Sequence, residues 1–209
     1  MADARGQDLV ELPMFPLASV LFPAMPLQLR VFEQRYLTML QDLLATDPAE
    51  FGVVLIERGQ EVGGGEHSFS VGTVARIAEI SPADGFIGVM AAGQDRLEVV
   101  EWLSDSPYPL ARVRRMPELE WDEGCGERRE QTELLVRRTL ARASEFEEHL
   151  WPSTIELADD PVARLWQLAA IAPIGPLDQL RLLECTTVRE LLDAMFVVVS
   201  DAGEALDGR

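Results

Sequence analysis

Hydrophobic and polar positions change their period once along the chain, near residue 117. Before that point, short apolar runs bounded by proline or glycine predict strands. After it, apolar residues recur every three to four positions and predict helices. The expected strands are 19–22, 27–31, 51–57, 71–80, 86–91, 96–102 and 111–116, with one helix at 33–44. The helices expected in the second half are 128–150, 162–171, 177–184 and 187–199.

Turn and cap residues mark several of these boundaries. The PADG sequence at 82–85 predicts a tight turn, because proline presets φ and glycine accepts a positive φ. A second turn is expected at 92–95, which would make a hairpin of the strands around it. Asp160–Pro161 is typical of a helix start, and Thr187–Glu190 has the spacing of a capping box.

The change of period predicts an α+β protein with two lobes. A β lobe is expected at 9–117 and a lobe of four helices at 128–200, joined by an acidic linker at 118–127. Residues 1–8 and 201–209 are expected to be flexible tails. A chain of 209 residues can bury roughly 70% of its unfolded surface, so neither lobe requires a disulfide or a metal.

The charged residues argue against anionic partners and against lysine-dependent catalysis. The chain has 36 acidic and 18 basic residues, a net charge of −18. Such a polyanion is repelled by nucleic acid and by anionic membranes, so neither partner is expected. All 18 basic residues are arginine. Without lysine the chain can form no Walker A motif, Ser–Lys dyad or Schiff base, and we expect it not to be an enzyme.

The few metal-ligating and nucleophilic side chains are scattered. Cys125, Cys185, His67 and His149 lack the spacing of a zinc site, so no metal and no cofactor are expected. The polar N-terminus resembles no signal peptide, and no apolar run approaches ~20 residues. Two cysteines without a signal peptide suit a reducing compartment, and a cytoplasmic protein is expected.

No catalytic constellation is visible in the sequence. Ser68 follows His67, but adjacent side chains on a strand point apart. The glycines at 63–65 lack the strand–glycine–helix context of a dinucleotide site and predict a hairpin loop. Arg112, Arg114 and Arg115 form a dense basic cluster, which we expect to neutralise neighbouring acids. Trp121 lies in the acidic sequence LEWDEG, where we expect it to dock between lobes or to contact a partner.

One long motif carries a resemblance. The sequence LPMFPLASVLFPAMPLQLRVFEQRYLTML, from Leu12 to Leu40, resembles the start of the Lon protease N-terminal domain. The segments FGVVLI, VGTVARIAEI and DGFIGVMAAGQDRLEV are similar to later parts of that domain, and the helical half fits more loosely. Ala24 stands where the family commonly has glycine, and Leu97 where it has an aromatic residue. The resemblance assigns structural roles to Pro13, Pro16, Phe22, Pro23, Phe32, Glu33, Arg35, Tyr36 and Gly72.

The resemblance implies a fold and a function. The implied fold is a PUA-like β pseudo-barrel followed by a helical bundle. The implied function is non-catalytic recognition of exposed hydrophobic segments in unfolded proteins or peptides, by a stand-alone domain without ATPase or protease modules. An apolar groove at the lobe junction is expected to use Met90, Leu97, Trp102 and Trp121.

Other functions remain open at this stage. An adaptor or regulator that docks on one folded partner, such as a separate protease or a chaperone, is the principal alternative. RNA binding follows from the PUA-like label but conflicts with the charge. A hydrolase would need a pocket with a perturbed group, which the sequence does not supply. The oligomeric state is left open.

Overall fold

The computed structural model describes residues 9–57, 68–103, 105–146 and 151–207. The expected tail at 1–8 and the glycines at 63–65 lie outside these residues. The chain divides into two compact units, Met1–Pro117 and Glu118–Arg209. We call them the β unit and the helical unit and describe each by itself.

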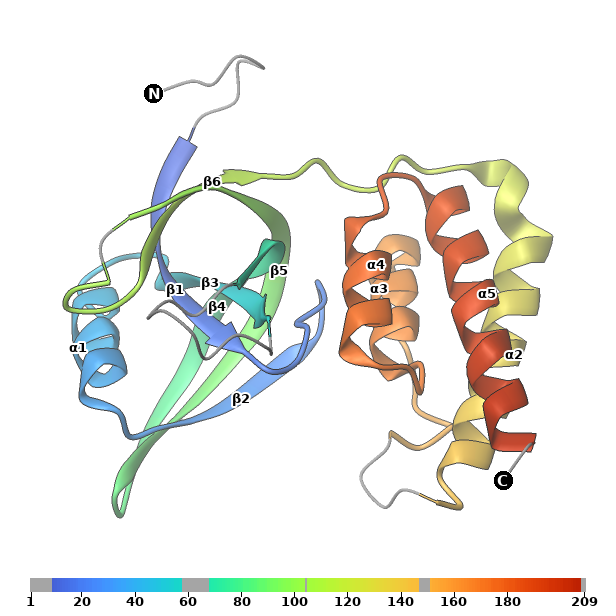
Figure 1. The fold of residues 1–209 in the computed structure, drawn as a ribbon, viewed down its shortest axis with the longest axis horizontal. Helices are drawn as coiled ribbons and strands as arrows, with labels where there is room; N and C mark the ends of the chain where they lie inside the picture. Colours follow the sequence, from blue (N-terminus) through green and yellow to red (C-terminus); the bar gives the residue numbers. More distant parts are fainter. Residues whose placement is uncertain (1–8, 58–67, 104, 147–150, 208–209) are drawn as a thin grey trace. The chain divides into compact units, whose positions relative to one another are not determined.

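The β unit is a six-stranded mixed sheet with one helix (Figure 1). Its elements are β1 (Leu9–Leu17), β2 (Pro26–Val31), α1 (Gln34–Leu43), β3 (Glu50–Ile56), β4 (Ser68–Ala83), β5 (Phe86–Trp102) and β6 (Leu110–Arg115). The strand order is β2-β5-β4-β3-β1-β6, and β5 also pairs with β6. Because the long β5 pairs on both flanks, the sheet curves back on itself and encloses its core. Among the strand pairs of this sheet that the structure describes, only β1–β3 is parallel.

Apolar side chains from five strands fill the interior of this sheet. The core cluster consists of Met14, Val54, Val74, Leu97, Val99, Ala111 and Val113. The helix α1 adds Tyr36, which is buried and stacks on Phe15 with ring centroids 4.0 Å apart. Phe15 in turn lies 6.1 Å from the ring of Phe51 on β3. The first strand and the first helix are thus joined through aromatic packing.

The strand expected at 19–22 is wrong, and the first strand lies earlier. β1 spans Leu9–Leu17 and contains Pro13 and Pro16. A proline removes only its own N–H, and its neighbours continue the ladder, as when the N–H of Met14 donates to the carbonyl of Pro109 at 2.8 Å. β1 also changes partner, from β6 to β3, at the first of these prolines.

The hairpin expected around 92–95 is also wrong, because β5 runs without interruption from Phe86 to Trp102. Gly93 lies where another segment crosses, and a Cβ at this position would stand 2.2 Å from the carbonyl oxygen of Phe22. The N–H of Ala24 donates to the carbonyl of Gly93, and the N–H of Gly93 donates to Met25. The glycine permits a close backbone approach and makes no turn. The turn predicted at 82–85 is confirmed, with Gly85 at a φ of 83°.

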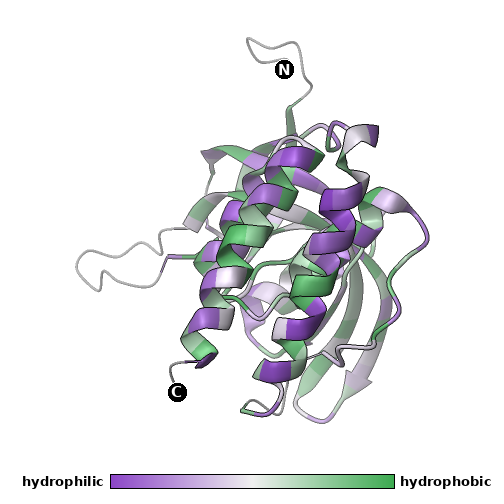
Figure 2. Cartoon of the chain, turned by 90° about the vertical axis from the view of Figure 1, so that its right-hand side faces the viewer, coloured by the Kyte–Doolittle hydropathy of each residue, from purple (hydrophilic) through white to green (hydrophobic). Residues whose placement is uncertain are grey.

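The helical unit contains four α-helices and one short 3₁₀-helix in its described residues (Figure 1). They are η1 (Glu123–Cys125), α2 (Gly126–Ala143), α3 (Pro161–Ile171), α4 (Pro176–Glu184) and α5 (Val188–Asp207). Hydrophobic and hydrophilic residues interleave along the long helices, as their amphipathic pattern predicts (Figure 2). The α+β class is confirmed. No described helix combines the length and apolar character needed to cross a membrane.

Three boundaries in this unit differ from expectation. α2 ends at Ala143 and not at 150. Directly after this end, the Ser144 hydroxyl donates to the carbonyl of Ala141 at 2.7 Å, and such a side-chain bond to the backbone competes with the hydrogen bonds of a continuing helix. α5 continues to Asp207, so most of the expected tail is helix, held by an ion pair between Arg142 and Asp207. The acidic linker is folded, because Leu119 and Cys125 within it are buried.

The predicted helix starts carry the predicted caps. Asp160 accepts a hydrogen bond from the N–H of Ala163 at 2.8 Å, and Pro161 opens α3. The N–H of Glu190 donates to the Thr187 hydroxyl at 3.2 Å, which completes half of the capping box. Both caps satisfy N–H groups that a helix start leaves unpaired.

Candidate functional site

The residues expected to form one apolar groove are dispersed. Met90 and Trp102 lie on β5 with 37% and 39% of their surface exposed. They are twelve positions apart, a path of roughly 40 Å along an extended strand. Leu97 lies between them with 0% exposure, because its side chain points into the core of the β unit. Leu97 is therefore a core residue, and it offers no surface to a ligand.

The residues of the long motif are mainly packing residues. Phe22 and Tyr36 are buried, with 1% and 4% exposure. Phe32 differs, because 68% of its surface is exposed. Glu33 is the N-cap of α1 and receives a hydrogen bond of 3.0 Å from Arg35, whose guanidinium also lies 4.7 Å from the ring centroid of Tyr36.

Two backbone positions that the resemblance singled out, Ala24 and Gly72, are tightly constrained. A Cβ at Gly72 would stand 2.1 Å from the carbonyl oxygen of Val53, so the close approach of the paired strands β4 and β3 requires glycine here. Ala24, which follows Pro23 in a turn, has a φ of 59°. It adopts the left-handed conformation for which the family's glycine is suited.

The arginine cluster of β6 is paired with carboxylates, as expected. Arg115 bonds the buried Glu50 at 2.5 Å, and Arg76 bonds the same carboxylate at 2.8 Å. The further pairs of this cluster are Arg112–Glu11, Arg112–Glu101, Arg114–Glu98 and Arg115–Asp95. These side chains hold the strands together and leave no free basic surface in the cluster.

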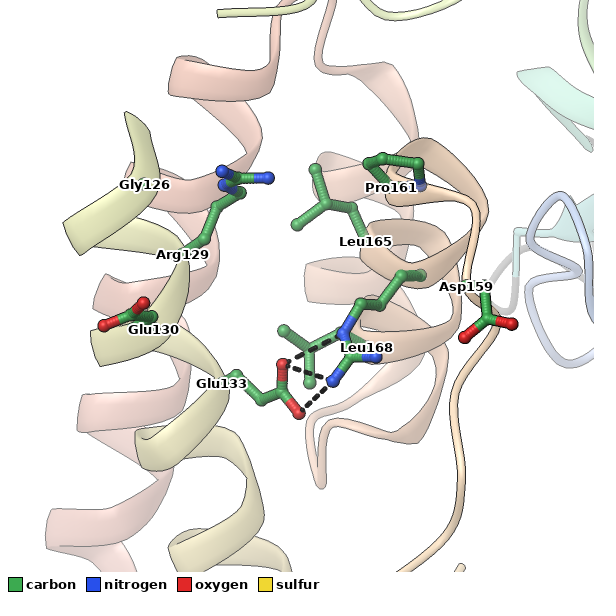
Figure 3. Close-up of a pocket in the computed structure, with 9 residues that line it drawn as sticks. Gly126, Arg129, Glu130, Glu133, Asp159, Pro161, Leu165 and Leu168 are labelled. Carbon is green, nitrogen blue, oxygen red and sulfur yellow. Dashed lines mark hydrogen bonds and ion pairs between the residues drawn. The ribbon is translucent and has the colours of Figure 1, made fainter. Parts of the chain in front are cut away.

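A pocket of about 350 Å³ lies in the helical unit, between α2 and α3 (Figure 3). Its size falls within the range of ligand sites. The residues that line it are Gly126, Arg129, Glu130, Glu133, Asp159, Pro161, Arg164, Leu165 and Leu168. The α3 side contributes mainly apolar surface, and α2 contributes charged side chains.

Glu133 and Arg164 neutralise each other at one end of the pocket. Two nitrogens of Arg164 donate to the carboxylate of Glu133 at 3.0 to 3.2 Å, and Arg137 donates at 2.9 Å. Burial is the largest influence on the pKa of Glu133 and raises it, but the hydrogen bonds and charges of the two arginines together hold that pKa below its ordinary value. Glu133 is therefore ionised at neutral pH and fully engaged.

Arg129 is in a different situation. Its guanidinium lies 4.8 Å from the ring centroid of Trp121, and its buried Nε has no hydrogen-bond partner. Among the residues that the structure describes, no carboxylate forms an ion pair with it. Trp121 donates its own Nε1–H to Glu123 at 3.0 Å. The pocket thus presents one cation that no described anion neutralises.

Sequence analysis singled out Trp121 but missed Arg129. The tryptophan was conspicuous because its neighbours are acidic, whereas Arg129 is one of many arginines on a predicted helix. That the cation has no carboxylate depends on where α3 lies, which no local pattern specifies.

Cys125 offers no reactive thiol. Its side chain is buried with 1% exposure, and burial followed by a hydrogen bond to Asp122 raises the pKa of the thiol. The thiolate that a nucleophile requires is thereby disfavoured. Within the described residues, no three side chains of His, Cys, Asp and Glu gather as a metal site would require.

Comparisons with known proteins agree on one family. Residues 11–201 match the model of the ATP-dependent protease La (LON) substrate-binding domain. The chain is 24% identical over 205 residues to the Lon protease of Brevibacillus choshinensis and 26% identical over 209 residues to Lon protease 2 of Herpetosiphon aurantiacus. These matches cover 94% and 95% of this chain but 26% and 24% of the relatives. The chain therefore spans about a quarter of their length.

Solved structures show the same fold. A crystal structure of a Lon N-terminal domain protein from Xanthomonas campestris aligns with a TM-score of 0.60 at 25% identity, over 88% of this chain and 96% of that one. The N-terminal domain of the Mycobacterium avium complex Lon protease aligns with a TM-score of 0.65 at 18% identity, over 92% and 99%. Both units of the chain take part in these alignments.

Proposed function

The chain belongs to the family of Lon substrate-binding domains, and on that premise we propose that it is a non-catalytic module that binds exposed hydrophobic segments of unfolded polypeptides. The observation that carries this proposal is the extent of the family match, which includes both units. The charge of −18 supports it, because a strongly charged surface keeps a protein with exposed apolar side chains in solution.

The β unit supplies exposed apolar side chains for such binding. On β5, Met90, Val100 and Trp102 are between 37% and 44% exposed. Methionine adapts to varied apolar partners, and tryptophan is a frequent anchor at binding surfaces. Because Met90 and Trp102 are far apart along β5, we propose that they are two separate contact points of the β unit. Trp121 is proposed as a contact point of the helical unit by itself.

A binding experiment tests this proposal. A labelled, permanently unfolded protein is titrated with the chain and followed by fluorescence anisotropy, with the folded counterpart and a labelled RNA run alongside. Saturable binding to the unfolded protein alone is the expected result. No binding at tens of micromolar would overturn the proposal and favour an adaptor that docks on one folded partner, and binding of RNA would contradict the repulsion expected from the charge.

Substitutions locate the contact surface. Met90→Asp and Trp102→Ala are each expected to weaken binding roughly fivefold, since each removes about 1 kcal/mol of apolar contact. Phe32→Ala is the matched control, because Phe32 is 68% exposed and lies outside the proposed contact points. Equal effects of all three substitutions would show that the binding is a general consequence of exposed apolar surface.

A further inference from the structure

We propose that the pocket between α2 and α3 binds the C-terminal residue of a polypeptide, with Arg129 receiving the free carboxylate. This inference rests on the proposed function, because it names the part of a polypeptide that one site takes. It depends on three features of the pocket: a cation without a carboxylate, the exposed apolar surface of Pro161 opposite it, and acids that point elsewhere.

Arg129 differs from its neighbour in the sequence, Arg128. Arg128 and Arg129 both stack on aromatic rings, Arg128 at 4.1 Å from Phe196 and Arg129 at 4.8 Å from Trp121. Arg128 also bonds Asp193 at 2.8 Å. Arg129 has no such partner among the described residues, and its buried Nε is unsatisfied.

Stacking leaves the edge of a guanidinium available. The ring of Trp121 covers one face of Arg129, while the N–H groups in the guanidinium plane can donate to a second group. The two oxygens of a carboxylate match these donors in pairs. An anion in the pocket would therefore give the Arg129 guanidinium the charged partner that the described part of the chain does not supply.

The surface opposite Arg129 is apolar. Figure 3 shows Arg129 extending from α2 into the space between the helices, across from Pro161 and Leu165. Leu165 and Leu168 lie behind this surface with 3% and 1% exposure, so Pro161 supplies most of the apolar surface that a ligand can reach. Glu133 and Arg164 neutralise each other at the other end of the pocket. A carboxylate with an apolar side chain on the same residue fits this arrangement.

The remaining acids limit the charge of the ligand. Glu130 and Asp159 line the pocket, but their carboxylates point away from Arg129 (Figure 3). They leave room for a single negative charge and would repel a phosphate or a run of acidic residues. With a volume of about 350 Å³, the pocket suits a chain end better than a long continuous segment.

Two forms of one peptide test this inference. A short labelled peptide that ends in leucine is prepared with a free carboxylate and with a C-terminal amide, and the affinity of each is measured by anisotropy. The free acid is expected to bind about tenfold more tightly, as hydrogen bonds to charged groups allow. The net charge of −18 works against this result, so a preference for the acid cannot come from general electrostatics.

Variants assign the preference to one side chain. Arg129→Gln is expected to abolish the difference between acid and amide, and Arg129→Lys to retain only part of it, because lysine cannot form the paired hydrogen bonds. Arg128→Gln is the matched control and is expected to keep the full preference. Circular dichroism and thermal melting confirm that each variant folds.

The outcomes separate this inference from the proposed function. If the unfolded protein binds but the acid and the amide bind equally, the carboxylate site is wrong and the proposed function stands. If the acid binds through Arg129 but the unfolded protein does not bind, the site stands and recognition of internal hydrophobic segments is wrong. Persistence of the acid preference in Arg129→Gln would also overturn the inference.

Discussion

The two units treat buried polar groups differently. In the β unit, the buried carboxylate of Glu50 is bonded by Arg76 and Arg115, and the buried hydroxyl of Thr73 donates to the carbonyl of Leu21 at 2.6 Å. In the helical unit, α2 carries the two buried side-chain atoms that lack a hydrogen-bond partner within the described residues, Arg129 Nε and Thr132 Oγ1. These buried polar groups of the β unit are hydrogen-bonded, whereas α2 of the helical unit carries buried polar atoms that have no partner within the described residues.

The two units also differ in how closely their backbones approach. In the β unit, Gly72 of β4 lies against the backbone of β3, and Gly93 of β5 lies against the connection between β1 and β2, so that no side chain can be added at either position. In the helical unit, Gly203 faces Thr139 at an ordinary contact distance, since a Cβ there would stand 3.6 Å from its hydroxyl oxygen. The difference teaches that the β unit is fixed by backbone contacts, whereas the helices are held by side chains that can adjust.

The largest expected effect tests this difference in backbone packing. Gly93→Ala is expected to destabilise the protein by about 3 kcal/mol or more, because the new Cβ would overlap the carbonyl of Phe22. Gly203→Ala is expected to be neutral or to stabilise α5 by up to about 1 kcal/mol. Urea denaturation of both variants measures the free energy of unfolding. Similar losses in the two would contradict the distinction between the units.

The same substitution in each unit should change stability in opposite directions. Thr73→Val removes a hydrogen bond and leaves the carbonyl of Leu21 unsatisfied, so a loss of about 1 to 2 kcal/mol is expected. Thr132→Val removes a buried hydroxyl that has no partner, so a gain of about 1 kcal/mol is expected. Both positions have 0% exposure, which makes the pair well matched. Denaturation midpoints that move in the same direction would refute the comparison.

Stability measured as a function of pH tests the ion pairs of Glu133 at the pocket. The pKa of Glu133 is lowered in the folded state, so its ion pairs stabilise the fold above its ordinary value of 4.5, and the stability is lost as the pH falls through the lowered folded value. At pH 7, Glu133→Gln is expected to cost about 1 kcal/mol, typical of a partly exposed pair. The cost should shrink in thermal melts below pH 4.5. A cost that is constant with pH would mean that shape, and not charge, is what Glu133 contributes.

The smallest expected effect concerns the strained backbone of Ala24, in the β unit. Ala24 is the one non-glycine residue with a positive φ in the described part of the chain. Ala24→Gly should relieve roughly 1 kcal/mol of strain and lose part of it to the greater freedom of the unfolded chain, for a net gain of about 0.5 kcal/mol. Chemical denaturation checks this gain. A loss of stability would show that the turn carries no strain.

Sequence reasoning succeeded where the controlling interactions are local. Asp160 caps α3 through a residue three positions away, and Thr187 and Glu190 mark the start of α5 in the same way. The turn at 82–85 likewise depends on proline and glycine within it. The long motif at 12–40 pointed to the family that the match over residues 11–201 shows.

Other features were decided only when distant segments came together. Gly93 resembled a turn residue, yet its role depends on Phe22, about seventy positions earlier in the chain. The burial of Leu97 follows from the closure of β5 onto β6, and the isolation of Arg129 follows from the placement of α3. Hydrogen bonds between residues three or four positions apart can be predicted from the sequence, because the geometry of a helix or turn brings those residues together. Close approach and charge neutralisation between distant segments depend on how the strands and helices pack, and the tertiary structure alone decides them.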